Sequence, residues 1–187
     1  MPLGRLLSAE FFNRPAEEVA PALLGKALVR RRERKRAVYR ITETEAYVGP
    51  YDLASHAARG RTLRTEPMFG PPGSLYIYLV YGMHWMLNVV TGEIDYPAAV
   101  LIRSVETITG PGRLTRALGI TGALNAQLAS ARSGLWFADL GDSVASQEIV
   151  RTPRIGVDYA GPVWAEKEYR FLISSPMSAG KHVRQVR

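Results

Sequence analysis

Short runs of apolar residues, bounded by charged residues or by glycine and proline, recur along the chain and predict β-strands. The clearest strands are predicted at residues 27–32, 37–46, 75–80, 85–90 and 100–105. Shorter strand candidates lie at residues 136–137, 155–157 and 170–173. The charged residues 33–36 separate the first two strands, and they predict a solvated hairpin turn rather than a binding arm.

Helices are predicted where proline and glycine bracket an apolar stretch, because proline favours the first turn of a helix and glycine its end. Residues 15–24 stop at Gly25, and residues 111–118 begin with a proline. We expect residues 123–130 to continue the second helical region. Residues 48–73 form a long loop rich in Gly, Pro and Arg, and loops of this length inside a domain are usually functional or disordered.

Together these elements predict an α+β fold with a mostly antiparallel, curved β-sheet flanked by helices. A chain of 187 residues can bury one sizeable core, so we expect a single domain over residues 1–187. The ordered core should span about residues 6–173, followed by a loose C-terminal tail. A protruding β-hairpin should join residues 75–80 to residues 85–90.

The net charge of +7 favours an anionic partner, of which nucleic acid is the commonest. Arginine supplies most of the positive charge, and its guanidinium grips phosphate with two hydrogen bonds and stacks on flat groups. A basic surface with no part in binding, or a biased genome composition, would give the same balance.

Several kinds of chemistry are excluded or disfavoured by composition. The chain has no cysteine, which excludes disulfides, thiolate nucleophiles and cysteine-ligated zinc. Its three histidines, His56, His84 and His182, show no metal-ligand spacing, so we expect no metal and no cofactor. The N-terminal residues lack the apolar core of a signal peptide. Residues 67–92 carry no charged side chain, but prolines and glycines interrupt them, which favours two strands over a membrane span.

Residues 40–50, Arg-Ile-Thr-Glu-Thr-Glu-Ala-Tyr-Val-Gly-Pro, are the richest in candidate chemistry. In a strand, Glu43, Glu45 and Tyr47 share one face. Unpaired buried carboxylates are costly, so two of them beside an aromatic ring indicate an acid–base site next to a flat ligand. We expect the Gly-Pro break to turn the chain back and bring His56 beside Tyr47.

Aromatic residues dominate the next two strands. Tyr76 and Tyr78 share a face, and Tyr81 lies at the Tyr-Gly tip of the predicted hairpin. An aromatic ring at such a tip in a basic protein can act as a wedge between stacked bases. The alternatives are core packing for the first two rings and chance exposure of the third.

Arg103 ends the apolar run at residues 98–102. An arginine on an otherwise buried strand usually has a carboxylate partner, and either Glu45 or Glu43 could supply it.

These residues belong to longer motifs that resemble the alkyladenine (3-methyladenine) DNA glycosylases, the methylpurine glycosylase family. The resemblance runs from about residue 6 to residue 173, with the motifs in the family's order. The motifs are Glu-Thr-Glu-Ala-Tyr-Val-Gly-Pro (residues 43–50), Asp52, His56, Met-Phe-Gly-Pro-Pro-Gly-Ser-Leu-Tyr-Ile-Tyr-Leu-Val-Tyr-Gly-Met (residues 68–83), Asn88, Leu-Ile-Arg (residues 101–103) and Gly-Pro-Gly-Arg-Leu (residues 110–114).

The resemblance implies a monofunctional hydrolase of base-excision repair, a DNA-3-methyladenine glycosylase. Such an enzyme flips alkylated or deaminated purines out of duplex DNA and hydrolyses the N-glycosidic bond. By motif position, Glu45 would be the general base that activates water, and Arg103 would hold the water and the carboxylate. Glu43 has no family role, and we expect it to form a salt bridge or to support Glu45.

The resemblance also implies how the flipped base is held. Tyr47 and His56 would form one wall of the base pocket and Tyr78 the opposite wall. Asn88 would lie at the pocket floor and disfavour the exocyclic amine of normal guanine. Tyr81 would be the minor-groove wedge that fills the space left by the base.

Basic residues near these motifs are candidate phosphate contacts. They are Arg59, Arg61 and Arg64 in the long loop, and Gly112 and Arg113 at a helix start that would present backbone N–H groups. Each is equally compatible with a solvated loop. Residues 62–65 read Thr-Leu-Arg-Thr where many relatives have Thr-Pro-Arg-Asn, so a family DNA contact in this loop is not carried over.

The expected partner is double-stranded DNA containing damaged purines such as 3-methyladenine, 7-methylguanine, hypoxanthine or ethenoadenine, bound by a monomer. The short basic N-terminus, without the long tail of nuclear relatives, predicts a bacterial enzyme that is cytoplasmic and nucleoid-associated.

Two other classes of function remain open. One is a DNA-binding protein that recognises lesions without cutting, against which the intact Glu45 and Arg103 argue. The other is a carbohydrate-active hydrolase that uses Glu43 and Glu45, which the basic charge and Tyr81 disfavour.

Overall fold

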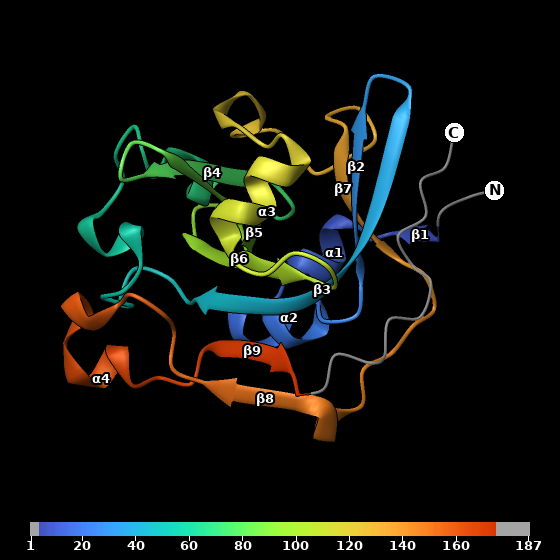
Figure 1. Cartoon of the computed structure of the whole chain (residues 1–187). Coiled ribbons are helices and arrows are strands. Elements are labelled where there is room, and N and C mark those ends of the chain that lie inside the picture. The colour runs from blue at the N-terminus through green and yellow to red at the C-terminus, as the bar shows by residue number, and fades with distance from the viewer. Residues whose placement is uncertain (1–3, 175–187) are drawn as a thin grey trace.

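A curled antiparallel β-sheet is the framework of the computed structural model, which describes residues 4–174 (Figure 1). Its strand order is β1-β7-β2-β3-β6-β5-β4, and β9 pairs with both β3 and β8. The strands are β1 (Arg5–Leu6), β2 (Ala27–Arg32), β3 (Lys35–Tyr47), β4 (Leu75–Val80), β5 (His84–Thr91), β6 (Ala98–Val105), β7 (Leu135–Asp139), β8 (Ile149–Thr152) and β9 (Arg170–Ile173). The predicted α+β class with an antiparallel sheet is confirmed.

Short helices cover the sheet and fill its connections. The α-helices are α1 (Ala9–Phe12), α2 (Ala16–Ala22), α3 (Pro111–Leu118) and α4 (Gly161–Ala165). Single 3₁₀ turns occur at η1 (His56–Arg59), η2 (Glu66–Phe69), η3 (Gly122–Leu124), η4 (Ser146–Glu148) and η5 (Asp158–Ala160). The turns η1 and η2 lie in the long loop, which is therefore structured.

Strand β3 organises the sheet because it pairs with three other strands. Its first half forms the hairpin with β2 that protrudes at the top of Figure 1. Its second half lies between β6 and β9, and the register with β6 shifts on both sides of Glu43. Thr44 is fully buried against α2, where its hydroxyl donates to the carbonyl of Ala20 at 2.8 Å. The opposite face of this half-strand carries Glu43 and Glu45.

The main hydrophobic core holds the helices against the sheet. Phe12, Leu23, Ile41, Leu87 and Leu114 are buried in it, and they come from the α1–α2 region, β3, β5 and α3. Helix α3 is also tied to β5 by a hydrogen bond from the Thr115 hydroxyl to the carbonyl of Trp85. This packing fixes β5 and β6, which carry predicted site residues.

Two predicted elements are wrong. Residues 123–130 are not a helix beyond η3, because the chain there runs beside β4: Leu75 and residues 126–127 exchange backbone hydrogen bonds. Residues 155–157 form a turn instead of a strand, with a positive φ of 75° at Gly156. Strands β1 and β8 and helices α1 and α4 were not predicted, and the predicted C-terminal tail lies outside the described residues.

Gly25 lies in the turn that follows helix α2, with a φ of +81°, and a Cβ there would lie 2.7 Å from Cγ2 of Val144. Replacing it by alanine should lower the free energy of unfolding by about 1–2 kcal/mol for the left-handed backbone alone, and further for the clash. Gly60 is a matched control, because it has a φ of +84° but nothing within 4 Å of its would-be Cβ. Urea denaturation should show a larger loss for Gly25→Ala than for Gly60→Ala; equal losses would contradict the close approach to Val144.

Candidate active site

Glu45 is a completely buried carboxylate whose two oxygens are both hydrogen-bonded. Its Oε1 accepts from the backbone N–H of Ile155 at 2.9 Å and lies 3.2 Å from Nη1 of Arg103. Its Oε2 accepts from the Tyr47 hydroxyl at 3.0 Å. Three segments of the chain, β3, β6 and the turn at Ile155, therefore meet at this one side chain.

Glu43 lies next to Glu45, and two arginines and a serine hydroxyl donate hydrogen bonds to its carboxylate. Its Oε1 accepts from Nε of Arg103 at 3.0 Å and from Nε of Arg170 at 2.7 Å, and its Oε2 accepts from the Ser104 hydroxyl. The predicted salt bridge of Glu43 is confirmed. The prediction that Arg103 pairs with Glu45 or Glu43 is also confirmed, since it pairs with both.

The two carboxylates differ in acidity because their surroundings differ. Burial raises the pKa of Glu45 above its usual value, and the Arg103 charge, the Ile155 N–H and the Tyr47 hydroxyl offset this only in part. Burial also acts on Glu43, but hydrogen bonds from Ser104 and Arg170 and the nearby charges hold its pKa below the usual value. Glu45 is thus the better proton acceptor of the two.

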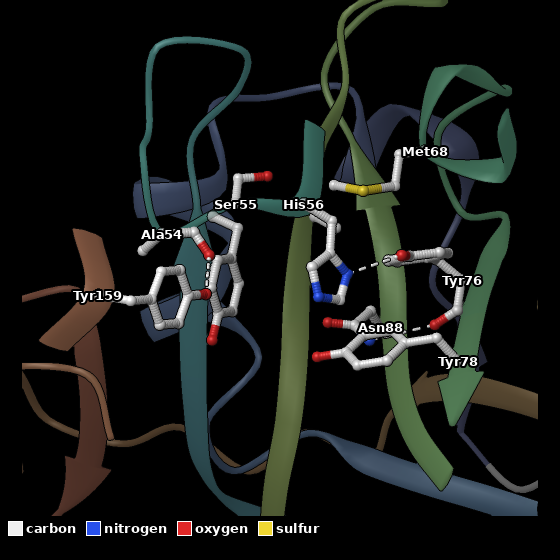
Figure 2. A pocket seen from close by; sticks show the side chains of 10 residues that line it. Ala54, Ser55, His56, Met68, Tyr76, Tyr78, Asn88 and Tyr159 are labelled. Carbon is white, nitrogen blue, oxygen red and sulfur yellow. Dashed lines mark hydrogen bonds between the residues drawn. The ribbon is translucent and has the colours of Figure 1, made fainter. Parts of the chain in front are cut away.

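A pocket lined largely by aromatic rings includes Tyr47, whose hydroxyl bonds to Glu45 (Figure 2). Its volume is about 30 Å³, which is room for a water molecule or two and not for a purine. The side chains that line it and bear on its chemistry are Tyr47, His56, Tyr76, Tyr78, Asn88 and Tyr159. The pocket must therefore widen before it can take a flat, base-sized ligand.

His56 packs on the side of the pocket that carries Tyr76 and Tyr78, as Figure 2 shows. Its ring lies edge-on to Tyr78, with centroids 4.5 Å apart, and its Nδ1 is 2.9 Å from the Tyr76 hydroxyl. The predicted division of the walls, with His56 opposite Tyr78, is therefore wrong. The cause is the η1 turn, which carries His56 past the end of β3 and over β4.

Tyr76 and Asn88 form the buried end of the pocket. The Asn88 side chain is 2% exposed, and its Nδ2 donates to the backbone carbonyl of Tyr76 at 3.1 Å. This hydrogen bond fixes the orientation of the amide. Burial raises the pKa of the Tyr76 hydroxyl to about 12, so this group is a neutral donor near pH 7.

The chain between residues 153 and 160 contributes to the site in ways that the sequence reasoning missed. Tyr159 lines the pocket, and its hydroxyl donates to the carbonyl of Ala54 at 2.8 Å. Ile155 acts through its backbone N–H, for which no side-chain pattern could have given a signal. Tyr159 could have been considered, because an aromatic residue stands there between a Gly-Val-Asp and an Ala-Gly sequence typical of a turn.

Tyr81 lies at the tip of the β4–β5 hairpin and is 86% exposed, with a left-handed φ of +52°. A non-glycine residue rarely adopts this conformation. The prediction that a large ring stands free at this tip is confirmed; its role as a wedge stays a prediction.

The predicted phosphate contacts have different environments. Arg59 and Arg113 are exposed, and neither forms an ion pair within residues 4–174. Arg61 forms ion pairs with Glu66 and Asp95, each at 2.8 Å. Its charge is therefore already paired, and the two contacts stabilise the long loop.

Arg64 and Gly112 lie close to side chains of the site region. The Arg64 guanidinium lies 5.4 Å from the Tyr78 ring centroid, at the pocket side of the loop. Gly112, in the first turn of α3, packs so closely on His84 that a Cβ would lie 3.2 Å from the imidazole.

Two broader features bear on the class of protein. Within residues 4–174, no group of three or more His, Asp or Glu side chains is arranged to hold a metal ion. No helix in this part of the chain is long and apolar enough to cross a membrane.

Several known proteins are similar in sequence to this chain over almost its whole length. A family model described as methylpurine-DNA glycosylase (MPG) matches residues 10–110 and 106–176. A protein of Myxococcus xanthus (strain DK1622) named "Putative 3-methyladenine DNA glycosylase" is 46% identical over 188 residues, which cover 94% of this chain and 93% of that protein. A protein with the same name from Methanocella arvoryzae is 46% identical, and the match covers 83% of this chain and 86% of that protein. Another from Legionella pneumophila (strain Corby) is 41% identical, and the match covers 90% of this chain and 94% of that protein.

We expect the imidazole of His56 to titrate with a pKa of about 4 instead of 6.5, because it is largely removed from solvent and the charges of Arg64 and Arg59 lie nearby. Between these two pH values the unfolded chain binds the proton and the folded one does not, so stability should fall as the pH drops through this window. NMR titration of the ring signals, assigned with His56→Gln, measures the pKa. Titration near pH 6.5 would contradict the buried placement.

Proposed function

The chain belongs to the methylpurine-DNA glycosylase family, and from this premise we propose that it is a monofunctional DNA glycosylase of base-excision repair that removes alkylated or deaminated purines from duplex DNA. The observation that carries the proposal is Glu45, a buried carboxylate with a raised pKa beside a pocket lined by aromatic rings. We propose further that it acts as a monomer, without a cofactor.

In the proposed reaction, water attacks C1′ of the deoxyribose as the N-glycosidic bond breaks. Glu45 accepts the proton of that water, and its negative charge stabilises the oxocarbenium-like transition state. Arg103 contacts Oε1 of Glu45 at 3.2 Å and would orient both the carboxylate and the water. The bonding electrons leave with the base.

Stacking would offset the cost of extruding the base. Flipping a nucleotide costs a few kcal/mol, and stacking on an aromatic ring returns roughly 1–3 kcal/mol per base. We propose that the base enters between Tyr47 on one side and His56 with Tyr78 on the other. Because the pocket now holds only about 30 Å³, these rings must separate as the base enters.

Stacking does not discriminate among bases, so selectivity must come from the pocket edge and from the leaving group. We propose that Asn88, fixed by its bond to the Tyr76 carbonyl, disfavours the exocyclic amine of guanine. A cationic methylated purine leaves as a neutral base without further help. A neutral lesion such as hypoxanthine also needs its leaving group protonated or hydrogen-bonded.

The DNA itself would be held on the face that carries the hairpin tip. We propose that Tyr81 enters the duplex from the minor groove and fills the space left by the base, a use of exposed rings that bends and opens DNA. Arg59, Arg64 and Arg113, together with the start of α3 at Gly112, are the proposed phosphate contacts. The net charge of +7 supports binding to a polyanion.

Glu45→Gln should slow excision strongly while preserving lesion binding, because the amide keeps the shape of the side chain but cannot accept a proton. Loss of general-base help corresponds to about 10²–10⁴-fold in rate. Single-turnover release of free base from duplexes that contain hypoxanthine or 7-methylguanine, together with Kd for the same duplexes, measures both effects.

Glu43→Gln is the matched control in the same cluster. It should lower the free energy of unfolding at neutral pH, because the depressed pKa of Glu43 means that its ionised form stabilises the fold above its unfolded pKa. Normal turnover by Glu45→Gln would overturn the role of Glu45. Lesion binding without base release by the wild type would instead indicate a DNA-binding protein that does not cut.

Arg59→Gln should weaken binding to all duplexes alike and reduce the slope of log Kd against log salt concentration by about one. Arg61→Gln should change this slope less, because Arg61 is already paired with Glu66 and Asp95. Binding titrations from low to moderate salt compare the two variants. Equal slopes for both would contradict the prediction that Arg59 contacts phosphate and Arg61 does so less.

A further inference from the structure

Asp52 and Arg154 form an ion pair that is fully buried behind the pocket, with both side chains 0% exposed. The two groups meet in a bidentate arrangement, with Nη2 of Arg154 2.9 Å from Oδ1 of Asp52 and Nη1 on Oδ2. They are 102 residues apart in sequence and join the long loop to the turn before η5.

The pair also holds the backbone on both sides of Tyr47. Asp52 Oδ2 accepts from the N–H of Val48 at 3.1 Å, and Nη1 of Arg154 donates to the carbonyl of Ala46 at 2.9 Å. A further bond at 3.2 Å joins Nη2 to the carbonyl of Trp164 in α4. The end of β3 and helix α4 are therefore fixed to the same guanidinium.

Two contacts connect the pair with the proposed chemistry. The guanidinium carbon of Arg154 lies 4.9 Å from the centroid of the Tyr47 ring, which in turn lines the pocket. The next residue, Ile155, donates its N–H to Oε1 of Glu45, and the Tyr47 hydroxyl donates to Oε2. Both non-arginine hydrogen bonds of Glu45 thus come from groups that Arg154 holds.

Stability alone explains this pair poorly. The desolvation cost of a buried ion pair often exceeds its attraction, and apolar side chains of similar volume frequently stabilise a protein as well or better. Arg154 also leaves its Nε buried without a hydrogen-bond partner among residues 4–174, which adds to the cost.

We propose that Arg154, neutralised by Asp52, is a positioning residue that aligns Tyr47 for the stacked base and keeps the Ile155 N–H on Glu45. This inference rests on the glycosylase function proposed above. Asp52 has a second role in this proposal, which is to neutralise the charge of Arg154. Without Asp52, a buried positive charge would lie behind the Tyr47 ring and repel a cationic purine stacked in front of it, more than a neutral one.

The proton affinity of Glu45 reports on this alignment. Loss of the Ile155 hydrogen bond removes a donor to the carboxylate, so its pKa rises further. The other groups that act on Glu45 come from the strands around it and from the turn beside it: Glu43 and Tyr47 on β3, Tyr78 on β4, Arg103 on β6, Tyr159 in η5, and Arg170, which bonds to Glu43, on β9. Of these, Tyr47 is itself in contact with Arg154 and changes with it. Arg154→Gln also leaves the Asp52 carboxylate buried without its counter-ion, whereas Arg154→Lys keeps the positive charge.

The test is the pH profile of single-turnover excision by Arg154→Gln, with Arg154→Lys as a milder second variant. The acid limb of the profile should move to higher pH by about half to one unit, as expected for the loss of one hydrogen bond to the carboxylate. Asp52→Asn should in addition reduce excision of 7-methylguanine more than excision of hypoxanthine.

Asp139→Asn is the matched control, because it removes the Lys26–Asp139 ion pair, 2.9 Å long and remote from the pocket. It should leave the acid limb and the ratio of the two lesions as in the wild type. Thermal unfolding of each variant is measured alongside.

The outcomes separate this inference from the proposed function. If the wild type releases base but the Arg154 variants lose only thermal stability, with an unmoved acid limb, then the positioning role is wrong. Failure of both Arg154 variants and Asp52→Asn to fold would likewise assign the pair to stability and overturn it. Absence of base release by the wild type would refute the glycosylase function itself.

Discussion

Arg103 contacts two carboxylates at once, and the rest of the site depends on how its hydrogen bonds are divided between them. Its Nε bonds to Glu43 at 3.0 Å and its Nη1 lies 3.2 Å from Glu45. Glu43 gains two further donors, from Ser104 and Arg170, and stays ionised. Glu45, completely buried and more weakly held, retains a raised pKa and the capacity to accept a proton.

The division of hydrogen bonds between Glu43 and Glu45 follows from the order of the strands in the sheet. The second half of β3 lies between β6, which supplies Arg103 and Ser104, and β9, which supplies Arg170. Polar contacts thus fix the carboxylates on one face of β3, while the other face is buried against α2. Tyr47 connects Glu45 to a pocket of only about 30 Å³, whose aromatic walls must move to admit a base.

Much of this could be predicted because it is local in the sequence. Short apolar runs bounded by charged or turn-forming residues located β2 and β4 to the residue, and a proline start located α3. The pairing of Arg103 with the glutamates followed from the cost of burying charge. The errors have long-range causes: residues 126–127 pair with Leu75 instead of continuing a helix, and η1 carries His56 toward Tyr78. The backbone N–H of Ile155 has no side-chain signature, and no local pattern joins Asp52 to Arg154.

The most direct measurement is a titration of the side-chain carboxylates by NMR in protein labelled with ¹³C-glutamate, with signals assigned through Glu43→Gln and Glu45→Gln. The structure predicts that Glu43 titrates below the ordinary pKa of 4.5 and that Glu45 titrates above it. If Glu45 titrated below 4.5 and Glu43 above it, Glu45 would not be the proton acceptor, and the division of roles set by Arg103 would be wrong.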